Sequence, residues 1–418
     1  MFDFLKFPEL RKKILITLFV IVIYRLFAHI PVPGVDIAAI RAYLSGNVFF
    51  GLFDLLSGGG FQNFSIVTLG LAPYINVSII MQLLMFMFPS LEELAKEGEY
   101  GREKINTYTK LGTVPMALLQ AYGIYFLLSK QRVIIPLNTF DLILLILTFT
   151  AGAMVLVWIG ELVTEYGVGN GVSLLIFVSI ISRLPTSVAG LLANVSVSNF
   201  TNMLIFFVLA FVVIVGVVLV NEGTRNVALE YGRRGERSQK VTNYLPIKMN
   251  QAGVIPIIFA ISVVMLPSLM SAPLQASGNA SLQNIGSFLA RNFTSEGVWY
   301  NITYFILVVG FTYFYTTIQF NPEKIADEIK KRGGFIPGVR PGRNTTTYLR
   351  TIVDRITLTG GLFLGFIAIL PYLLQASVGI SVLSIGGTSL LIVVSVVLET
   401  IRQIQSLTVT RSYESFLS

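Results

Sequence analysis

Residues 49–65 read Phe49-Phe-Gly-Leu-Phe-Asp-Leu-Leu-Ser-Gly-Gly-Gly-Phe-Gln-Asn-Phe-Ser65, and a second apolar run from Ile66 to Phe88 follows directly. The first apolar piece stops at three glycines and is shorter than the roughly 20 residues that a membrane-spanning helix needs. The second piece is long enough to span. Backbone outside a spanning helix cannot face lipid, because its N–H and C=O groups would stay unpaired. The short piece is therefore predicted, at membrane depth, to lie within protein or line a cavity, and to move.

The composition is that of a polytopic membrane protein. Of the 418 residues, 54% are hydrophobic and only 12% are charged, against about 25% charged in ordinary globular domains. Cysteine is absent and His29 is the single histidine. This excludes disulfides, thiolate metal sites, cysteine nucleophiles and a Ser-His-Asp arrangement, so neither a cofactor nor a metal is expected.

Hydropathy predicts an all-α protein with ten spans. The spans lie near residues 14–30, 66–88, 111–129, 140–160, 172–192, 203–221, 252–271, 299–319, 356–375 and 387–406. Of the 30 Lys and Arg residues, 24 fall at the termini or in alternate loops on one side. Because basic residues concentrate in cytoplasmic loops, both termini are expected to be cytoplasmic.

Cutting the chain after the fifth span gives two halves, 1–192 and 193–418, with five spans each. An odd number of spans makes the halves enter the membrane from opposite sides, which predicts inverted-repeat architecture. Secondary transporters share this architecture, so a transporter is the alternative function.

Ionisable residues within the spans are few, and they lie towards span ends where side chains can snorkel: Arg25, Glu161, Arg183, Glu399 and Arg402. An ion-coupled transporter or an intramembrane protease would place such residues in mid-span. The pattern therefore argues against both, and the protein is not expected to be an enzyme.

Two basic loops, 222–250 and 321–355, are longer than the 2–8 residues or so that connect adjacent helices. One interpretation is that the basic residues of these loops set the orientation of the chain in the membrane and attract anionic lipid. The other is a docking surface for a large acidic partner such as a motor protein or ribosomal RNA. The candidate docking residues are Arg233, Arg234, Arg237, Lys240, Lys331, Arg332 and Arg340.

Six collinear motifs extend along nearly the whole chain. They are Ile30-Pro-Val-Pro-Gly-Val-Asp36, Leu69-Gly-Leu-Ala-Pro-Tyr-Ile-Asn-Val-Ser-Ile-Ile-Met-Gln-Leu83, Gly167-Val-Gly-Asn-Gly-Val-Ser173, Leu245-Pro-Ile-Lys-Met-Asn-Gln-Ala-Gly-Val-Ile-Pro256, Phe335-Ile-Pro-Gly-Val-Arg-Pro-Gly342 and Gly386-Gly-Thr-Ser-Leu-Leu-Ile392. With these motifs the chain resembles the SecY family of the bacterial Sec translocase. The resemblance implies a ten-helix clamshell that conducts unfolded secretory polypeptides across the membrane and releases membrane segments sideways into lipid.

The resemblance also implies roles for particular residues. The segment 50–64 would be a re-entrant plug helix, with Phe53, Leu55, Leu56, Gly58, Gly59, Gly60 and Phe61 as its candidate residues. A ring of aliphatic side chains would form the waist of the channel: Leu71, Ile75, Ile176, Ile258 and Ile392. Such side chains offer ions no hydration and can dewet when closed.

The family's lateral gate lies between spans two and three and spans seven and eight. Asn76 and Gln120 are polar residues in spans two and three, although ordinary hydrogen bonding between helices explains either one equally well. The implied partners are SecE, SecG, the motor SecA or the ribosome, signal sequences and membrane lipids, with no role for DNA. Arg340 matches the partner-contacting arginine of the family. The implied location is the bacterial cytoplasmic (inner) membrane.

Overall fold

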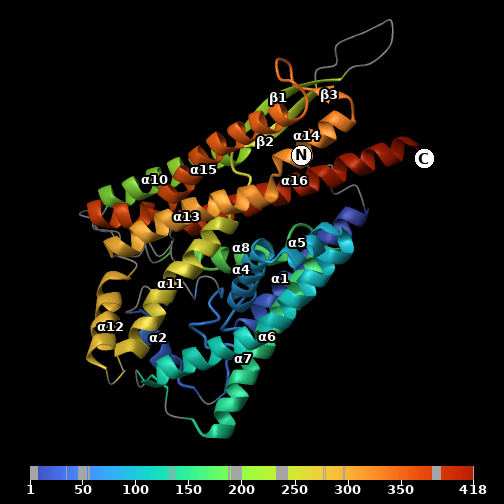
Figure 1. Ribbon diagram of the computed structural model, residues 1–418. Helices are drawn as coiled ribbons and strands as arrows, with labels where there is room; N and C mark the ends of the chain where they lie inside the picture. Colours follow the sequence, from blue (N-terminus) through green and yellow to red (C-terminus); the bar gives the residue numbers. More distant parts are fainter. Residues whose placement is uncertain are drawn as a thin grey trace, which may run out of the picture. The chain divides into compact units, whose positions relative to one another are not determined.

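The computed structural model describes residues 8–417, apart from 34, 46–53, 55–56, 131–132, 135–136, 187–188, 190–199, 232–242, 276, 278, 295–296 and 379–386. The chain forms two compact units (Figure 1). The first comprises Met1–Val197 and Val396–Ser418, and the second comprises Ser198–Ser395.

The first unit is built from helices. Their bounds are α1 Pro8–Phe27, α2 Ile37–Ser45, α4 Ala72–Met87, α5 Pro89–Lys96, α6 Glu99–Lys130, α7 Thr139–Tyr166 and α8 Gly171–Ile181. α6 and α7 pack along one another, and α1 and α8 pack on α7. A core cluster that includes Phe61, Phe64 and Phe149 lies where α6 and α7 meet the segment before α4. The apolar faces of these helices therefore enclose the glycine-containing stretch.

The second unit combines helices with a small sheet. Its helices are α10 Phe200–Glu222, α11 Ile255–Gln275, α12 Ala280–Asn292, α13 Val298–Gln319, α14 Pro322–Lys331 and α15 Arg343–Val378. Its strands are β1 Thr224–Tyr231, β2 Asn243–Lys248 and β3 Gly334–Phe335, in the antiparallel order β2-β1-β3. α16, Gly387–Leu417, begins in the second unit and ends in the first.

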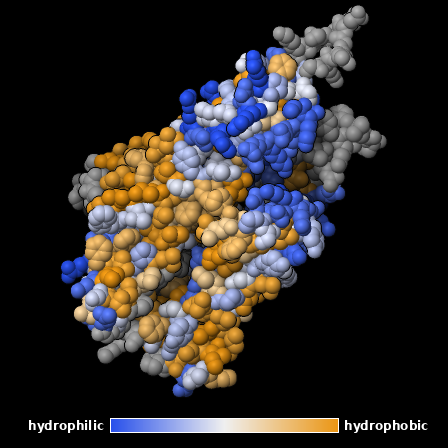
Figure 2. Space-filling model, viewed as in Figure 1, coloured by the Kyte–Doolittle hydropathy of each residue, from blue (hydrophilic) through white to orange (hydrophobic). Residues whose placement is uncertain are grey.

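The sheet lies in the two basic loops, which the sequence interpretation left without strands. In β1, Val227 and Leu229 are buried in alternation with more exposed residues, the period-two pattern of a half-buried strand. They pack with Ile329 of α14 and with Leu349 of α15 in one apolar cluster. Figure 2 shows hydrophilic residues over β1–β3 and α14, and hydrophobic residues along α13 and α15. The prediction of an all-α protein therefore holds for the membrane part, and the loops add a folded basic layer.

Each of the ten predicted spans overlaps one helix. Among the described residues, five helices are long and apolar enough to cross a membrane, or six if the bent pair α4–α5 counts as one span. The predicted span 66–88 starts too early, because residues up to Leu71 form turns and α4 begins only at Ala72. The chain then bends by 103° between α4 and α5, at Pro89. Proline lacks the N–H that would continue the helix through this point.

Candidate functional site

The stretch from Ser57 to Phe64, here called the glycine turn, is a chain of turns rather than a helix. Its backbone has φ values of 64° at Gly58 and 89° at Gly59, in the left-handed region that favours glycine. A Cβ added to Gly58 would lie 2.6 Å from the hydroxyl oxygen of Tyr24. The three glycines therefore allow the backbone both to reverse direction and to lie directly against α1.

The apolar side of the glycine turn is inserted into the core of the first unit. Phe61 and Phe64 are almost fully buried. The ring of Phe64 meets the ring of Phe149 edge to face, with 5.1 Å between centroids. Burying two phenylalanines stabilises the turn by about 3–6 kcal/mol relative to leaving them exposed.

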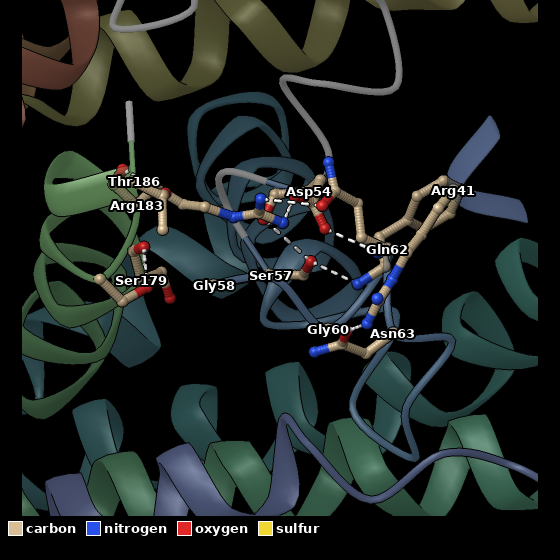
Figure 3. A network of polar contacts seen from close by, with 12 residues as sticks. Arg41, Asp54, Ser57, Gly58, Gly60, Gln62, Asn63, Ser179, Arg183 and Thr186 are labelled. Carbon is tan, nitrogen blue, oxygen red and sulfur yellow. Dashed lines mark hydrogen bonds and ion pairs between the residues drawn. The ribbon is translucent and has the colours of Figure 1, made fainter. Parts of the chain in front are cut away.

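On its polar side, the turn is held by a buried ion pair (Figure 3). Asp54, whose side chain is 4% exposed, pairs with the guanidinium of Arg183 just beyond the end of α8. The backbone N–H of Gln62 donates to Oδ1 of Asp54 at 2.7 Å, and Nη1 of Arg183 donates to Oε1 of Gln62 at 2.9 Å. The three residues form a closed ring of interactions between the turn and α8.

A second set of contacts joins the turn to α1. The hydroxyl of Tyr24 donates to the carbonyl of Ser57 at 3.1 Å and lies 2.5 Å from the hydroxyl of Ser179 on α8. Nη1 of Arg25 donates to the carbonyl of Gly58 at 2.6 Å. A buried carbonyl without a donor would cost about 1–3 kcal/mol. The side chains of α1 therefore supply donors to two carbonyls of the turn, in addition to the backbone hydrogen bonds within it.

The far end of the glycine turn contacts α2 and the end of α1. Nη2 of Arg41 donates to Oδ1 of Asn63 at 2.6 Å, and Nδ2 of Asn63 donates to the carbonyl of Ala28 at 3.3 Å. Three arginines, Arg25, Arg41 and Arg183, thus hold a segment in which Asp54 is the one ionisable residue between positions 50 and 64.

The candidate plug residues fall into two groups. Gly58, Gly59, Gly60 and Phe61 lie in the glycine turn and are buried, whereas Phe53, Leu55 and Leu56 lie outside the described residues. Residues 57–64 form turns, so the plug helix that the resemblance implies does not extend through them, in line with the break predicted at the three glycines. Three consecutive glycines, with positive φ at two of them, explain why helix ends here.

The candidate waist residues are distributed over both units. Leu71 and Ile75 lie at the start of α4, and Ile176 lies in α8, all three buried. Ile258 is half-buried in α11, and Ile392 is buried near the start of α16. The ring that they would form together stays a prediction.

The remaining candidates lie on the expected elements. Asn76 on α4 and Gln120 on α6 are half-buried, on two helices that pack together. Lys331, Arg332 and Arg340 are exposed around the end of α14 and the turn that follows it. The other candidate docking residues lie outside the described residues: Arg233, Arg234, Arg237 and Lys240.

The sequence interpretation missed the polar contacts of the glycine turn. It placed Arg25, Arg183 and Glu161 towards span ends, where side chains can snorkel, and named no protein partner for them. Arg183 pairs with Asp54, and Glu161 pairs with Lys110 at 2.6 Å. The available signal was a lone carboxylate inside an apolar run, which requires a partner. Its partner is 129 positions away, a separation at which spacing carries no information.

Comparison with known proteins gives a consistent result. The family model described as SecY matches residues 65–401. The protein translocase subunit SecY of Thermus thermophilus is 41% identical over 428 residues, covering 99% of this chain and 96% of the relative. The SecY subunit of Corynebacterium glutamicum is 41% identical over 438 residues, covering 99% and 98%.

Solved structures share the fold. A protein conducting channel superposes with a TM-score of 0.63 at 19% identity, over 97% of this chain and 96% of the other. A SecY protein whose plug domain stabilises the closed channel and maintains a membrane seal gives 0.62 at 20% identity, over 96% and 93%. Sec61 from a canine ribosome-channel complex gives 0.60 at 17% identity, over 96% and 93%. A family model that matches more than half of the chain, together with relatives 41% identical over nearly all of it, establishes that the chain belongs to the SecY family.

Proposed function

We propose that this protein is the protein-conducting channel of a Sec translocase. It moves unfolded secretory polypeptides across the membrane and releases membrane segments sideways into lipid. The observation that carries the proposal is a buried, non-helical segment within an apolar helical unit, in a chain of the SecY family. Non-helical backbone at membrane depth is tolerated only inside protein or along a water-filled cavity.

The segment 50–64 acts as the plug of this channel. This assignment is supported by the attachment of the glycine turn on two sides. Its phenylalanines pack in the core, and its polar groups contact arginines. Many of the polar contacts of the turn are made by single side chains. Water or a polypeptide in transit can take the place of these contacts. Such a segment can leave and return without unfolding the helices around it. The aliphatic ring of Leu71, Ile75, Ile176, Ile258 and Ile392 closes around the polypeptide in transit.

The channel has no catalytic residues of its own and depends on partners for driving force. SecE and SecG are its small membrane subunits, and SecA or the ribosome binds the basic loops. The support is an ordered, exposed basic layer formed by β1–β3 and α14, in a family with relatives solved in ribosome-bound channel complexes. The protein resides in the bacterial cytoplasmic membrane, with two inverted halves and both termini in the cytoplasm.

The test is reconstitution of the complex in liposomes with SecA, ATP and a preprotein. Translocation is measured as the preprotein that becomes protected from added protease. Planar bilayer recordings of the same complex with residues 50–64 deleted are expected to show raised ion conductance in the resting state. Absence of ATP-dependent protection would contradict the channel function. Unchanged conductance with intact translocation would contradict the plug assignment alone.

A further inference from the structure

A pocket of about 680 Å³ lies in the second unit, between the first residues of β1 and one face of α15. The strand contributes Thr224, Arg225 and Asn226. The helix contributes a stripe from Tyr348 to Thr359 at spacings of three and four residues. This spacing is that of a single helix face, so the pocket is a groove with one wall of helix and one of strand.

Two arginines face this groove from opposite walls. Arg225 lies on the same side of β1 as Val227 and Leu229, which pack against α15, and Arg355 lies on α15 itself. Neither guanidinium forms an ion pair with any residue in the described part of the chain. Two unpaired cations that share a groove with hydroxyl and amide groups make a site for an anion, because their mutual repulsion falls when the anion binds.

The groove lies at the boundary between polar and apolar surface. Continuing the α15 stripe by three to four residues at a time leads from Arg355 through Thr359 to Leu362 and Phe366, which are 45% and 49% exposed. On α10, Leu219 is 66% exposed only five residues before Thr224. The hydrophobic surface along α15 ends where the hydrophilic layer of strands begins (Figure 2). The anion site thus lies directly at the end of an exposed apolar stripe.

We propose that this groove binds an anionic phospholipid, with the phosphate between Arg225 and Arg355 and an acyl chain along Leu362 and Phe366. A free phosphate would use the arginines but would leave the apolar stripe without a role. The planar guanidinium fork of arginine matches phosphate oxygens in pairs. Tyr348 adds a hydroxyl group beside it, and the side chains of Ile352 and Ile356 suit the glycerol backbone.

The test measures the accessibility of individual arginines in the intact complex. Nanodiscs are prepared from phosphatidylcholine alone or with added phosphatidylglycerol, and arginines are labelled with a dicarbonyl reagent and quantified by peptide mass spectrometry. We expect phosphatidylglycerol to slow labelling of Arg225 and Arg355 by about fivefold or more, from the usual energy of one basic residue at an anionic surface. Arg350 on the same helix lies outside the groove and is the internal reference, with little change expected.

A second arm uses variants and a soluble anion. By native mass spectrometry, R225Q and R355Q are each expected to lower retention of phosphatidylglycerol about fivefold, and R350Q to leave it unchanged. Inorganic phosphate should not reproduce the protection, and equal protection by it would replace the lipid with a free anion. Labelling that is equally slow in both lipids would show a protein subunit over the groove and overturn the proposal. Equally fast labelling in both would overturn it as well.

Discussion

Arg183 supports the glycine turn through a buried ion pair with Asp54 and a hydrogen bond to Gln62. Its side chain is 25% exposed and that of its partner Asp54 is 4% exposed. Removing one member of a fully buried pair costs about 3 kcal/mol or more. Because a quarter of Arg183 reaches solvent, we expect Arg183→Gln to destabilise the closed state by about 2 kcal/mol, roughly a 30-fold shift in the closed-to-open ratio. The measurement is single-channel conductance of the resting complex in planar bilayers.

Two further variants separate pairing from simple loss of charge. Asp54→Asn combined with Arg183→Gln leaves neither charge unpaired, so we expect the double variant to leak less than the two single effects added together. Lys96→Gln breaks an exposed pair with Glu92, whose side chains are 66% and 55% exposed, and should leave conductance unchanged. Strictly additive effects of the two substitutions would show that the pair does not hold the turn.

Gly58 offers a test of close approach rather than of charge. Gly58→Ala places a methyl group 2.6 Å from the Tyr24 hydroxyl, at a residue with φ of 64°. Gly98 has φ of 85° and no atom within 4 Å of an added Cβ, so Gly98→Ala carries the backbone cost, about 1–2 kcal/mol, without the contact. We expect Gly58→Ala to raise resting conductance and Gly98→Ala to leave it at the starting level. Equal conductance of the two variants would mean that α1 does not press on the turn.

The turn that carries Arg340 holds this side chain in an exposed position. Gly338 and Gly342 flank it with φ values of 79° and 105°, and Ile336 anchors it in the apolar cluster of the sheet. The side chain of Arg340 itself is exposed. We expect Arg340→Glu to abolish SecA-driven translocation while leaving the amount of complex in the membrane unchanged. Preprotein protection and immunoblotting of membranes are the two measurements.

Arg343→Glu is the matched control for that turn. It makes the same charge change three residues away, at the first residue of α15, where the helix dipole favours a carboxylate. We expect nearly normal translocation from this variant. If both variants block translocation equally, general charge and not the presented arginine binds the partner.

Individual elements show which features a single sequence reveals. The break at the three glycines was predictable, because local conformational preference and run length decide it. The sheet in the loops was not predicted, although Val227 and Leu229 alternate with polar neighbours, because a strand of eight residues among basic loops gives a short signal. The contact between Asp54 and Arg183 was beyond sequence reasoning, because packing of α8 against the turn, and no local pattern, brings the two together.

The helical architecture of the whole chain is determined by hydrophobicity and charge, which act over every span. That is why the helical architecture could be predicted from sequence, whereas the family was identified by resemblance, from six collinear motifs. The grouping of residues from Val396 onward with the first unit could not be predicted, because it depends on tertiary packing of a helix that begins in the second. The candidate waist likewise combines residues of both units, such as Ile75 and Ile392, and depends on how they assemble.

The proposed orientation predicts which loops lie on each side of the membrane. Because the chain contains no cysteine, single introduced cysteines can test this prediction. Single cysteines at Asn138 and Thr294, both exposed, should react with a membrane-impermeant maleimide added to intact cells. Single cysteines at Lys96 and Lys330 should react only after the cells are opened, because inverted halves with cytoplasmic termini place these loops inside. The cysteine-free chain is the control for background labelling.

The four positions together distinguish the inverted arrangement from its rivals, since each half contributes one residue to each side. If Asn138→Cys and Thr294→Cys label on opposite sides, the halves contain an unequal number of spans and the inverted repeat is wrong. If each of the four cysteines labels from the side opposite to the one expected, the inverted repeat is kept and the orientation of the whole chain is reversed. That result would place the glycine turn at the cytoplasmic end of α1, where it could not close the external side of a channel, so the plug assignment would fall with it.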